Sequence, residues 1–165
     1  MPSKDVKRGS TLFLRLAVSL IGLGVLALCV LLLPVLWLSA DDTFRQNSYV
    51  VRVAVCAMYA AAVLFYAGVY QGWQVLNLID KNQVFSLQSV KYLHRISYCA
   101  AGISLIYAIS LPFFFLWAQG DDAPGLGLIS VFLIGVSLII SVAMGLLGRL
   151  LDEAVRIKSE NDLTV

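Results

Sequence analysis

Four apolar segments constrain this chain more than any other feature of its sequence. They cover residues 16–38, 50–73, 96–117 and 126–147, and each exceeds the about 20 helical residues that cross a hydrocarbon core. Hydrophobic residues make up 60% of the chain and charged residues 13%, whereas a soluble domain has about 25% charged residues. Inside lipid the backbone must satisfy its own hydrogen bonds, and these segments lack barrel-type alternation. The sequence therefore predicts an all-α membrane protein, with residues 1–165 forming a single domain that is a bundle of four transmembrane helices.

The basic residues indicate how these helices are oriented. Most of the 12 lysines and arginines fall in the N-terminal arm, in the connection 77–95 or in the tail 148–165. The other side has Arg45 and Arg52 only, beside two pairs of aspartates. Since segments rich in Lys and Arg stay in the cytoplasm, we expect both termini and the connection to be cytoplasmic.

Aromatic residues near the segment ends fit this orientation. Trp37 and Trp117 fall near the predicted outer interface, and Trp73 and Tyr92 near the inner one. Trp and Tyr are enriched at both membrane interfaces. We therefore expect these four side chains to form aromatic belts.

The two halves of the chain share a pattern. A Leu-Pro pair, a Trp and two aspartates occur in this order within residues 33–42 and again within residues 111–122. Two hairpins of the same orientation would be related by an axis along the membrane normal; chance similarity is the alternative. Pro34 and Pro112 each remove a backbone donor, so each can bend its helix.

Small residues recur every four positions in three of the segments. In lipid, such residues let helix backbones approach closely where no hydrophobic effect drives association. They are Gly68 and Gly72, then Ala100, Ser104 and Ala108, then Ser137, Ser141 and Gly145. The pattern predicts a compact bundle, although the same faces can equally form a homo-oligomer.

The second segment also carries a polar stripe. Its residues are Tyr59, Tyr66, Tyr70, Gln74 and Asn77. Their spacing brings them to one face of a helix, which should point into the bundle or toward a partner. One hypothesis is a small-molecule pocket; the alternative is hydrogen bonding between helices together with tyrosine at the interface.

Several classes of function lack the residues that they require. The middle of each span holds no Asp, Glu, Lys or His, which argues against proton-coupled transport. Cys29, Cys56 and Cys99 occur singly, and His94 has no ligand partner at suitable spacing. Neither a glycine-rich phosphate loop nor a nucleophile motif is present. We therefore expect no enzymatic activity, no cofactor and no bound metal.

The connection contains a segment that we call the collar, Asp80–Arg95. Ser86 is predicted to be the N-cap of a helix, with Phe85 positioned to pack on the fourth helical residue. The following turns place apolar residues on one edge and Lys91 and Arg95 on another. A basic amphipathic segment of this kind suits the headgroups of an anionic leaflet.

The tail, Arg149–Val165, has a similar character. The last helix should continue into it, with Asp152 and Arg156 forming an i to i+4 pair. Collar and tail together would make a cytoplasmic platform for a partner. Helix ends whose basic side chains extend to the interface are the alternative.

Four stretches resemble a bacterial membrane family known as domain of unknown function 2975. They are "KRGSTLFLRLAV" (7–18), "LIDKNQVFSLQSVKYLHRISYCA" (78–100), "DDAPG" (121–125) and "RLLDEAVRIKSENDLTV" (149–165). The resemblance covers essentially the whole chain. It implies a short four-helix protein of the bacterial inner membrane, often encoded beside a small helix-turn-helix DNA-binding regulator. It carries over no catalytic residues, so what it implies is a partner.

Two hypotheses follow. In the first, the collar and the tail bind a cytoplasmic regulator, without direct contact to nucleic acid. In the second, a small carrier or immunity-type protein engages a cationic peptide or drug through the polar stripe or through the aspartate pairs Asp41/Asp42 and Asp121/Asp122.

Overall fold

The computed structural model describes residues 3–43, 48–81, 83–120 and 125–162, all of them helical apart from the connection between α3 and α4. The elements are α1 (Ser3–Ala27), the π-helical turn η1 (Leu28–Leu32), α2 (Leu33–Thr43), α3 (Ser48–Asp80), α4 (Leu87–Gly120) and α5 (Gly125–Asp162). Together α1, η1 and α2 form one membrane-long helix, and α3, α4 and α5 supply three more. The prediction of an all-α protein with four transmembrane helices is confirmed.

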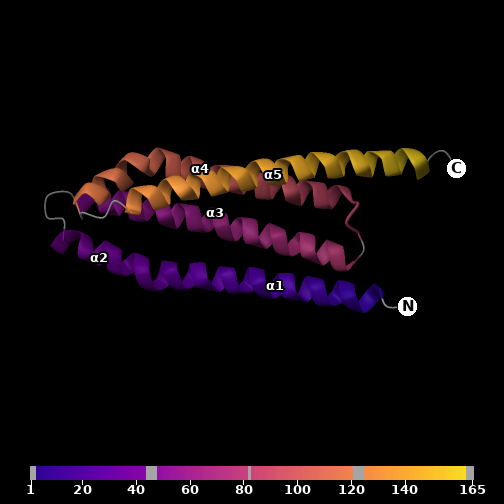
Figure 1. Cartoon of the computed structure of the whole chain (residues 1–165), viewed down its shortest axis with the longest axis horizontal. Helices are drawn as coiled ribbons and strands as arrows, with labels where there is room; N and C mark the ends of the chain where they lie inside the picture. The colour runs from indigo at the N-terminus through magenta and orange to yellow at the C-terminus, as the bar shows by residue number, and fades with distance from the viewer. Residues whose placement is uncertain (1–2, 44–47, 82, 121–124, 163–165) are drawn as a thin grey trace.

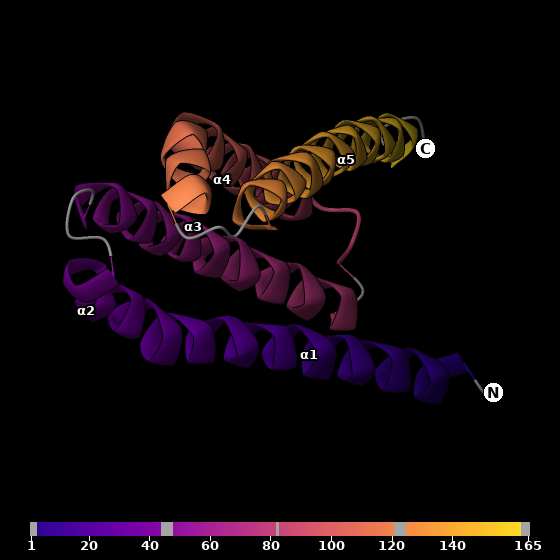
Figure 2. The ribbon, with the colours of Figure 1, turned by 60° about the vertical axis from the view of Figure 1, so that its left-hand side comes forward.

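The helices form an elongated bundle with the two ends of the chain on the same side (Figure 1). The N-terminus, the connection between α3 and α4, and the C-terminus lie at what we call the terminal end. The last turns of α2 and α4 and the first turns of α3 and α5 lie at the opposite end. The main contacts join consecutive helices: α1 and α2 pack on α3, α3 on α4, and α4 on α5. Figure 2 shows α1 and α5 on opposite sides of α3.

The hydrophobic core lies toward the opposite end. Its buried residues are Leu33, Val50, Val51, Ala54, Val55, Ala61, Tyr107, Phe114 and Trp117. Trp117 is only 5% exposed, so its ring packs within the bundle, with its centroid 6.5 Å from that of Phe114, and is not open to the headgroups as expected of a belt residue. Because α2, α3 and α4 all contribute, this core joins the two halves of the chain, and the hairpins are not separate units.

The two prolines have different local structures. In η1 the N–H of Leu33 donates to the carbonyl of Leu28, so the next bond in this register would run from Pro34 to Cys29. Proline has no N–H, and the Cys29 carbonyl accepts a bond from the Tyr59 hydroxyl, at 3.2 Å, from α3. Pro112 lies inside the continuous helix α4. The shared Leu-Pro pattern therefore produces a π turn in one half only.

Small residues make the contact between α4 and α5. The Ser97 hydroxyl donates to the Ser141 carbonyl at 2.7 Å, and the Ser141 hydroxyl donates to the Ser97 carbonyl at 2.9 Å. A Cβ on Gly145 would lie 3.2 Å from the Ser97 Oγ, and one on Gly148 would lie 2.8 Å from the His94 ring. Close approach of these two backbones requires small residues at these positions.

The other residues of the predicted small-residue pattern behave unevenly. Ala100, Ser104 and Ser137 are buried. Ala108 is exposed, and a Cβ on Gly72 would meet nothing within 4 Å. The pattern thus marks helix contacts at some positions and open surface at others.

Candidate functional site: the polar face of α3 and the collar

The polar stripe of α3 lies against the first helix. The Tyr66 hydroxyl donates to the carbonyl of Gly22 at 2.7 Å, and the Tyr59 hydroxyl donates to that of Cys29. Tyr70 and Gln74 bond to each other at 3.0 Å, and Tyr70 is 61% exposed. Three of the five stripe residues, Tyr59, Tyr66 and Asn77, therefore form hydrogen bonds with the first helix.

The contacts between the first helix and α3 follow a seven-residue register. The two helices run antiparallel, and each contact lies seven residues further along α3 and seven residues further back along the first helix than the one before it. The facing pairs are Cys29 with Tyr59, Gly22 with Tyr66, and Arg15 with Trp73. A repeat of seven keeps the same face of each helix toward the other, as in a coiled coil, so these three pairs form a seam between the helices that we call the polar seam.

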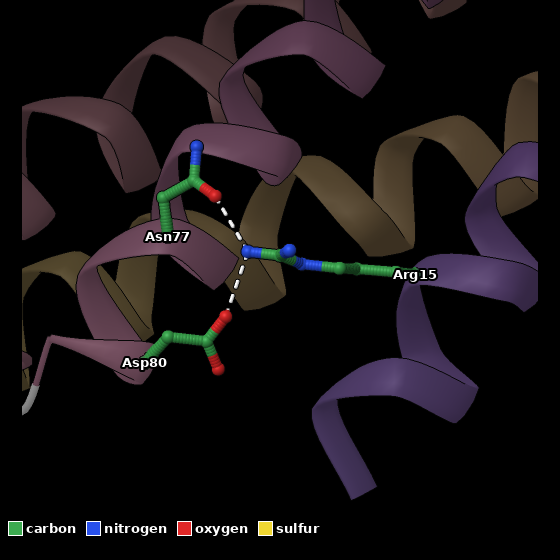
Figure 3. Close-up of polar contacts among 3 residues, drawn as sticks. All are labelled: Arg15, Asn77 and Asp80. Carbon is green, nitrogen blue, oxygen red and sulfur yellow. Dashed lines mark hydrogen bonds and ion pairs between the residues drawn. The ribbon is translucent and has the colours of Figure 1, made fainter. Parts of the chain in front are cut away.

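Arg15 ends this seam near the terminal end (Figure 3). Its Nη2 donates to Asn77 Oδ1 at 2.6 Å and to Asp80 Oδ2 at 2.7 Å. Its guanidinium also lies 5.5 Å from the centre of the Trp73 ring, within the range of a cation–π interaction. Asp80, which we expected to bind a partner, is thus paired with Arg15. Its side chain is 36% exposed.

A second arginine and tryptophan meet near the opposite end. The guanidinium of Arg52, on α3, lies 5.6 Å from the centre of the Trp37 ring on α2. At the terminal end the first helix supplies the arginine and α3 the tryptophan. At the opposite end α3 supplies the arginine and α2 the tryptophan. The first hairpin is thus held by a cation–π pair at each end and by tyrosine hydroxyls between them.

Ser86 lies directly before α4 and is its N-cap residue, as the sequence predicts. The Ser89 N–H approaches the Ser86 carbonyl at 3.0 Å and the Ser86 Oγ at 3.4 Å, so the N-cap prediction is confirmed. Ser89, which is 1% exposed, also donates from its hydroxyl to the Gln83 carbonyl at 3.4 Å. This side chain fixes the connection to the first turn of α4.

The collar meets the tail across an open hollow of ≈ 480 Å³. It is lined by Gln83, Phe85, Ser86, Leu87, Gln88 and Lys158. Phe85 is 60% exposed, and Lys91 and Arg95 are exposed nearby on α4. The hollow thus combines apolar surface with positive charge from two segments that are distant in the sequence.

The tail has a different ion pair from the predicted one. Arg156 Nε lies 3.5 Å from Glu160 Oε1, while Asp152 is exposed. Both carboxylates lie four residues from the arginine, but the glutamate has one more methylene and reaches the guanidinium. Both groups are well exposed, so the pair adds little stability.

Sequence reasoning missed the roles of Arg15, Trp73 and Ser89. Arg15 belongs to the basic N-terminal arm and Trp73 to the expected inner aromatic belt, and neither assignment predicts a contact between them. The seven-residue spacing from Arg15 through Gly22 to Cys29 matches that from Tyr59 through Tyr66 to Trp73. This match was the available signal, although pairing the two series requires knowing that the helices are neighbours.

Two sets of predicted residues fall outside what the structure describes. These are the side chains of Asp41 and Asp42, and the whole of Asp121 and Asp122. Among the described residues, no group of three or more His, Cys, Asp or Glu side chains could hold a metal ion.

The helix lengths and the polar seam define an all-helical membrane protein whose first helix is held to its second by hydrogen bonds. Residues 13–165 match the family described as "Protein of unknown function (DUF2975)", and the chain belongs to this family. It is also 43% identical over 160 residues to the "Uncharacterized membrane protein YoaS" of Bacillus subtilis (strain 168), covering 97% of this chain and 100% of that protein. No solved structure matches the chain.

Proposed function

We propose that the protein is a non-enzymatic component of the bacterial inner membrane that binds a cytoplasmic protein through the collar and the tail. The observation that carries this proposal is the hollow in which Lys158 of the tail faces Phe85 to Gln88 of the collar. Aromatic side chains are enriched in protein–protein interfaces, and Phe85 supplies one here beside the positive charge of Lys158. A partner with an acidic and apolar surface would complement them.

The partner that we propose is a small helix-turn-helix DNA-binding regulator. This choice rests on the resemblance to the family, whose members are often encoded beside such a regulator. Held at the membrane by its protein-binding surface, the regulator would be kept from its DNA sites. The membrane protein would then control transcription without touching nucleic acid itself.

Affinity purification from native membranes tests this proposal. The tagged protein should retain a soluble DNA-binding protein after crosslinking, and the double variant Phe85→Ala with Lys158→Glu should lose most of it. Phe132→Ala is the matched control, because Phe132 is 69% exposed on the membrane-spanning part of α5. Capture of no DNA-binding protein, with unchanged transcription of the neighbouring regulator's targets after gene deletion, would refute the proposal.

The carrier hypothesis has less support where it relies on the polar stripe, because Tyr59, Tyr66 and Asn77 bond to the first helix. Its other route, through the aspartate pairs Asp41/Asp42 and Asp121/Asp122, lies outside the described residues. Replacing both Tyr66 and Tyr70 by phenylalanine separates the two ideas. A change in susceptibility to cationic peptides or drugs would favour the carrier.

A further inference from the structure

The two parts of the first membrane-long helix are attached differently. Leu33 of α2 is 3% exposed and belongs to the hydrophobic core. Between residues 12 and 27 of α1, only Gly22 is buried, where the Tyr66 hydroxyl reaches its carbonyl. Hydrophobic packing therefore holds α2, while hydrogen bonds and the contacts of Arg15 hold α1.

The boundary between these two parts is the π turn η1 (Leu28–Leu32). A π turn interrupts the regular hydrogen-bond ladder, and kinks in helices occur at such turns and at prolines. Here both features coincide, because Pro34 lies two residues after the end of the turn. The direction of α1 can therefore change at η1 without disturbing α2.

Arg15 connects α1 to the last turn of α3. It bonds to Asn77 and Asp80, and the carbonyl of Asn77 accepts the Lys81 N–H at 3.3 Å. The side chain of Arg15 thus acts on the residues where α3 ends and the collar begins.

Further hydrogen bonds continue from this turn to α4. The Gln83 N–H donates to the Leu78 carbonyl at 2.9 Å, and the Gln83 carbonyl accepts the Ser89 hydroxyl. Ser89 in turn bonds to the cap residue Ser86. A contiguous set of hydrogen bonds and helical turns thus links the position of α1 to the start of α4, and energetic coupling between two sites can be carried by such a network.

We infer that α1 is an arm that pivots at η1, and that Arg15 couples its docking on α3 to the conformation of the collar. When α1 is docked, the charge of Asp80 is neutralised by Arg15. When α1 is undocked, the collar gains an unpaired carboxylate and the end of α3 loses its tether. The regulatory consequence rests on the proposed function: docking of α1 favours binding of an acidic partner, and undocking releases it.

Distances between spin labels test the motion of α1 without any partner. The labels replace Leu12 on α1 and Leu150 on α5, which are 65% and 63% exposed, in full-length protein with its three cysteines changed to alanine and reconstituted in bilayer discs. We expect one dominant distance in the parent protein. In Arg15→Gln and in Asp80→Asn a second distance should appear, with the undocked population raised roughly tenfold, as about 1.4 kcal/mol of lost contact predicts. An unchanged distribution in both variants would overturn the inference.

Two further variants complete this experiment. Lys91→Gln removes an exposed cation of the collar and should leave the distances unchanged. Trp73→Leu retains both hydrogen bonds of Arg15 and removes only the ring contact, so it should give a smaller shift in the same direction. If Arg15→Gln does not fold, a parent-like distribution in Trp73→Leu would count against the inference.

Hydrogen exchange of residues 81–90 tests the coupling to the collar. Asp80→Asn should raise amide exchange there roughly tenfold, and Lys91→Gln should not. If α1 moves while this exchange stays constant, the coupling is wrong and partner binding can still stand. If the exchange changes but no regulator is captured, the proposed function fails and the coupling stands.

Discussion

The helix pairs α1–α3 and α4–α5 solve the same problem in different ways. Lipid removes the hydrophobic effect that joins helices in water, so packing and hydrogen bonds must hold each pair. Between α4 and α5 the backbones approach closely at Ser97, Ser141 and Gly145. Between α1 and α3 long side chains bridge the helices at seven-residue intervals. Close packing tolerates little displacement, whereas bridges by single side chains can break one at a time.

Enlarging Gly148 should have the largest effect. A Cβ added at this position would lie only 2.8 Å from the His94 ring. The ring is itself held by a 3.0 Å contact with the Val90 carbonyl. Gly148→Leu should therefore lower the free energy of unfolding by about 1–3 kcal/mol, measured by denaturation in mixed micelles. Gly24→Leu on α1, where a Cβ meets nothing within 4 Å, is the control. Equal losses in both variants would contradict the assigned difference in packing.

Removing Arg15 should have the next largest effect and should be confined to α1. Arg15→Gln loses an ion pair and a cation–π contact. The paired side chains are about a third exposed, so the ion pair alone adds little, and we expect a loss of about 1.4 kcal/mol from the ion pair and the cation–π contact together. Protease accessibility of α1 should rise while that of α5 stays constant. A uniform rise along the chain would indicate that α1 is integral to the core.

Tyr66→Phe should destabilise α1 less than the loss of Arg15 does. It deletes the hydrogen bond to Gly22, and such bonds between membrane helices contribute about 0.6 kcal/mol on average. Tyr70→Phe is the matched control, since the Tyr70 hydroxyl contacts Gln74 on its own helix. The same denaturation assay should distinguish the two variants, and similar losses would argue against the seam.

The smallest expected effect is at Ser97 and Ser141. Each hydroxyl donates to the backbone carbonyl of the other serine, so one bond remains when the other hydroxyl is removed. A double-mutant cycle with alanine should therefore give a coupling energy of about 0.5 kcal/mol. Close backbone packing should persist in both single variants. A coupling energy above that of the Arg15 and Asp80 pair would reverse the comparison, since hydrogen bonds would then dominate α4–α5 as well.

The sequence is sufficient to predict the number and type of the helices, because a long apolar helix satisfies its own backbone hydrogen bonds in lipid and the segments lack barrel-type alternation. It also located the start of α4, since capping by Ser86 depends on neighbours in the chain. The stripe on α3 was visible as a periodic set of polar residues, but periodicity does not name the helix that it faces.

The pairing of the helices, in contrast, depends on contacts between residues that are far apart in the sequence. Arg15 meets Asp80 across 65 positions of the sequence, and Lys158 reaches the collar from the far end of the chain. The tertiary structure also shows that Pro34 lies beside a π turn and Pro112 within a regular helix, and that Trp117 is buried. Each of these outcomes depends on which neighbouring helix supplies a hydroxyl, a ring or an aliphatic surface, and that information is not local in the sequence.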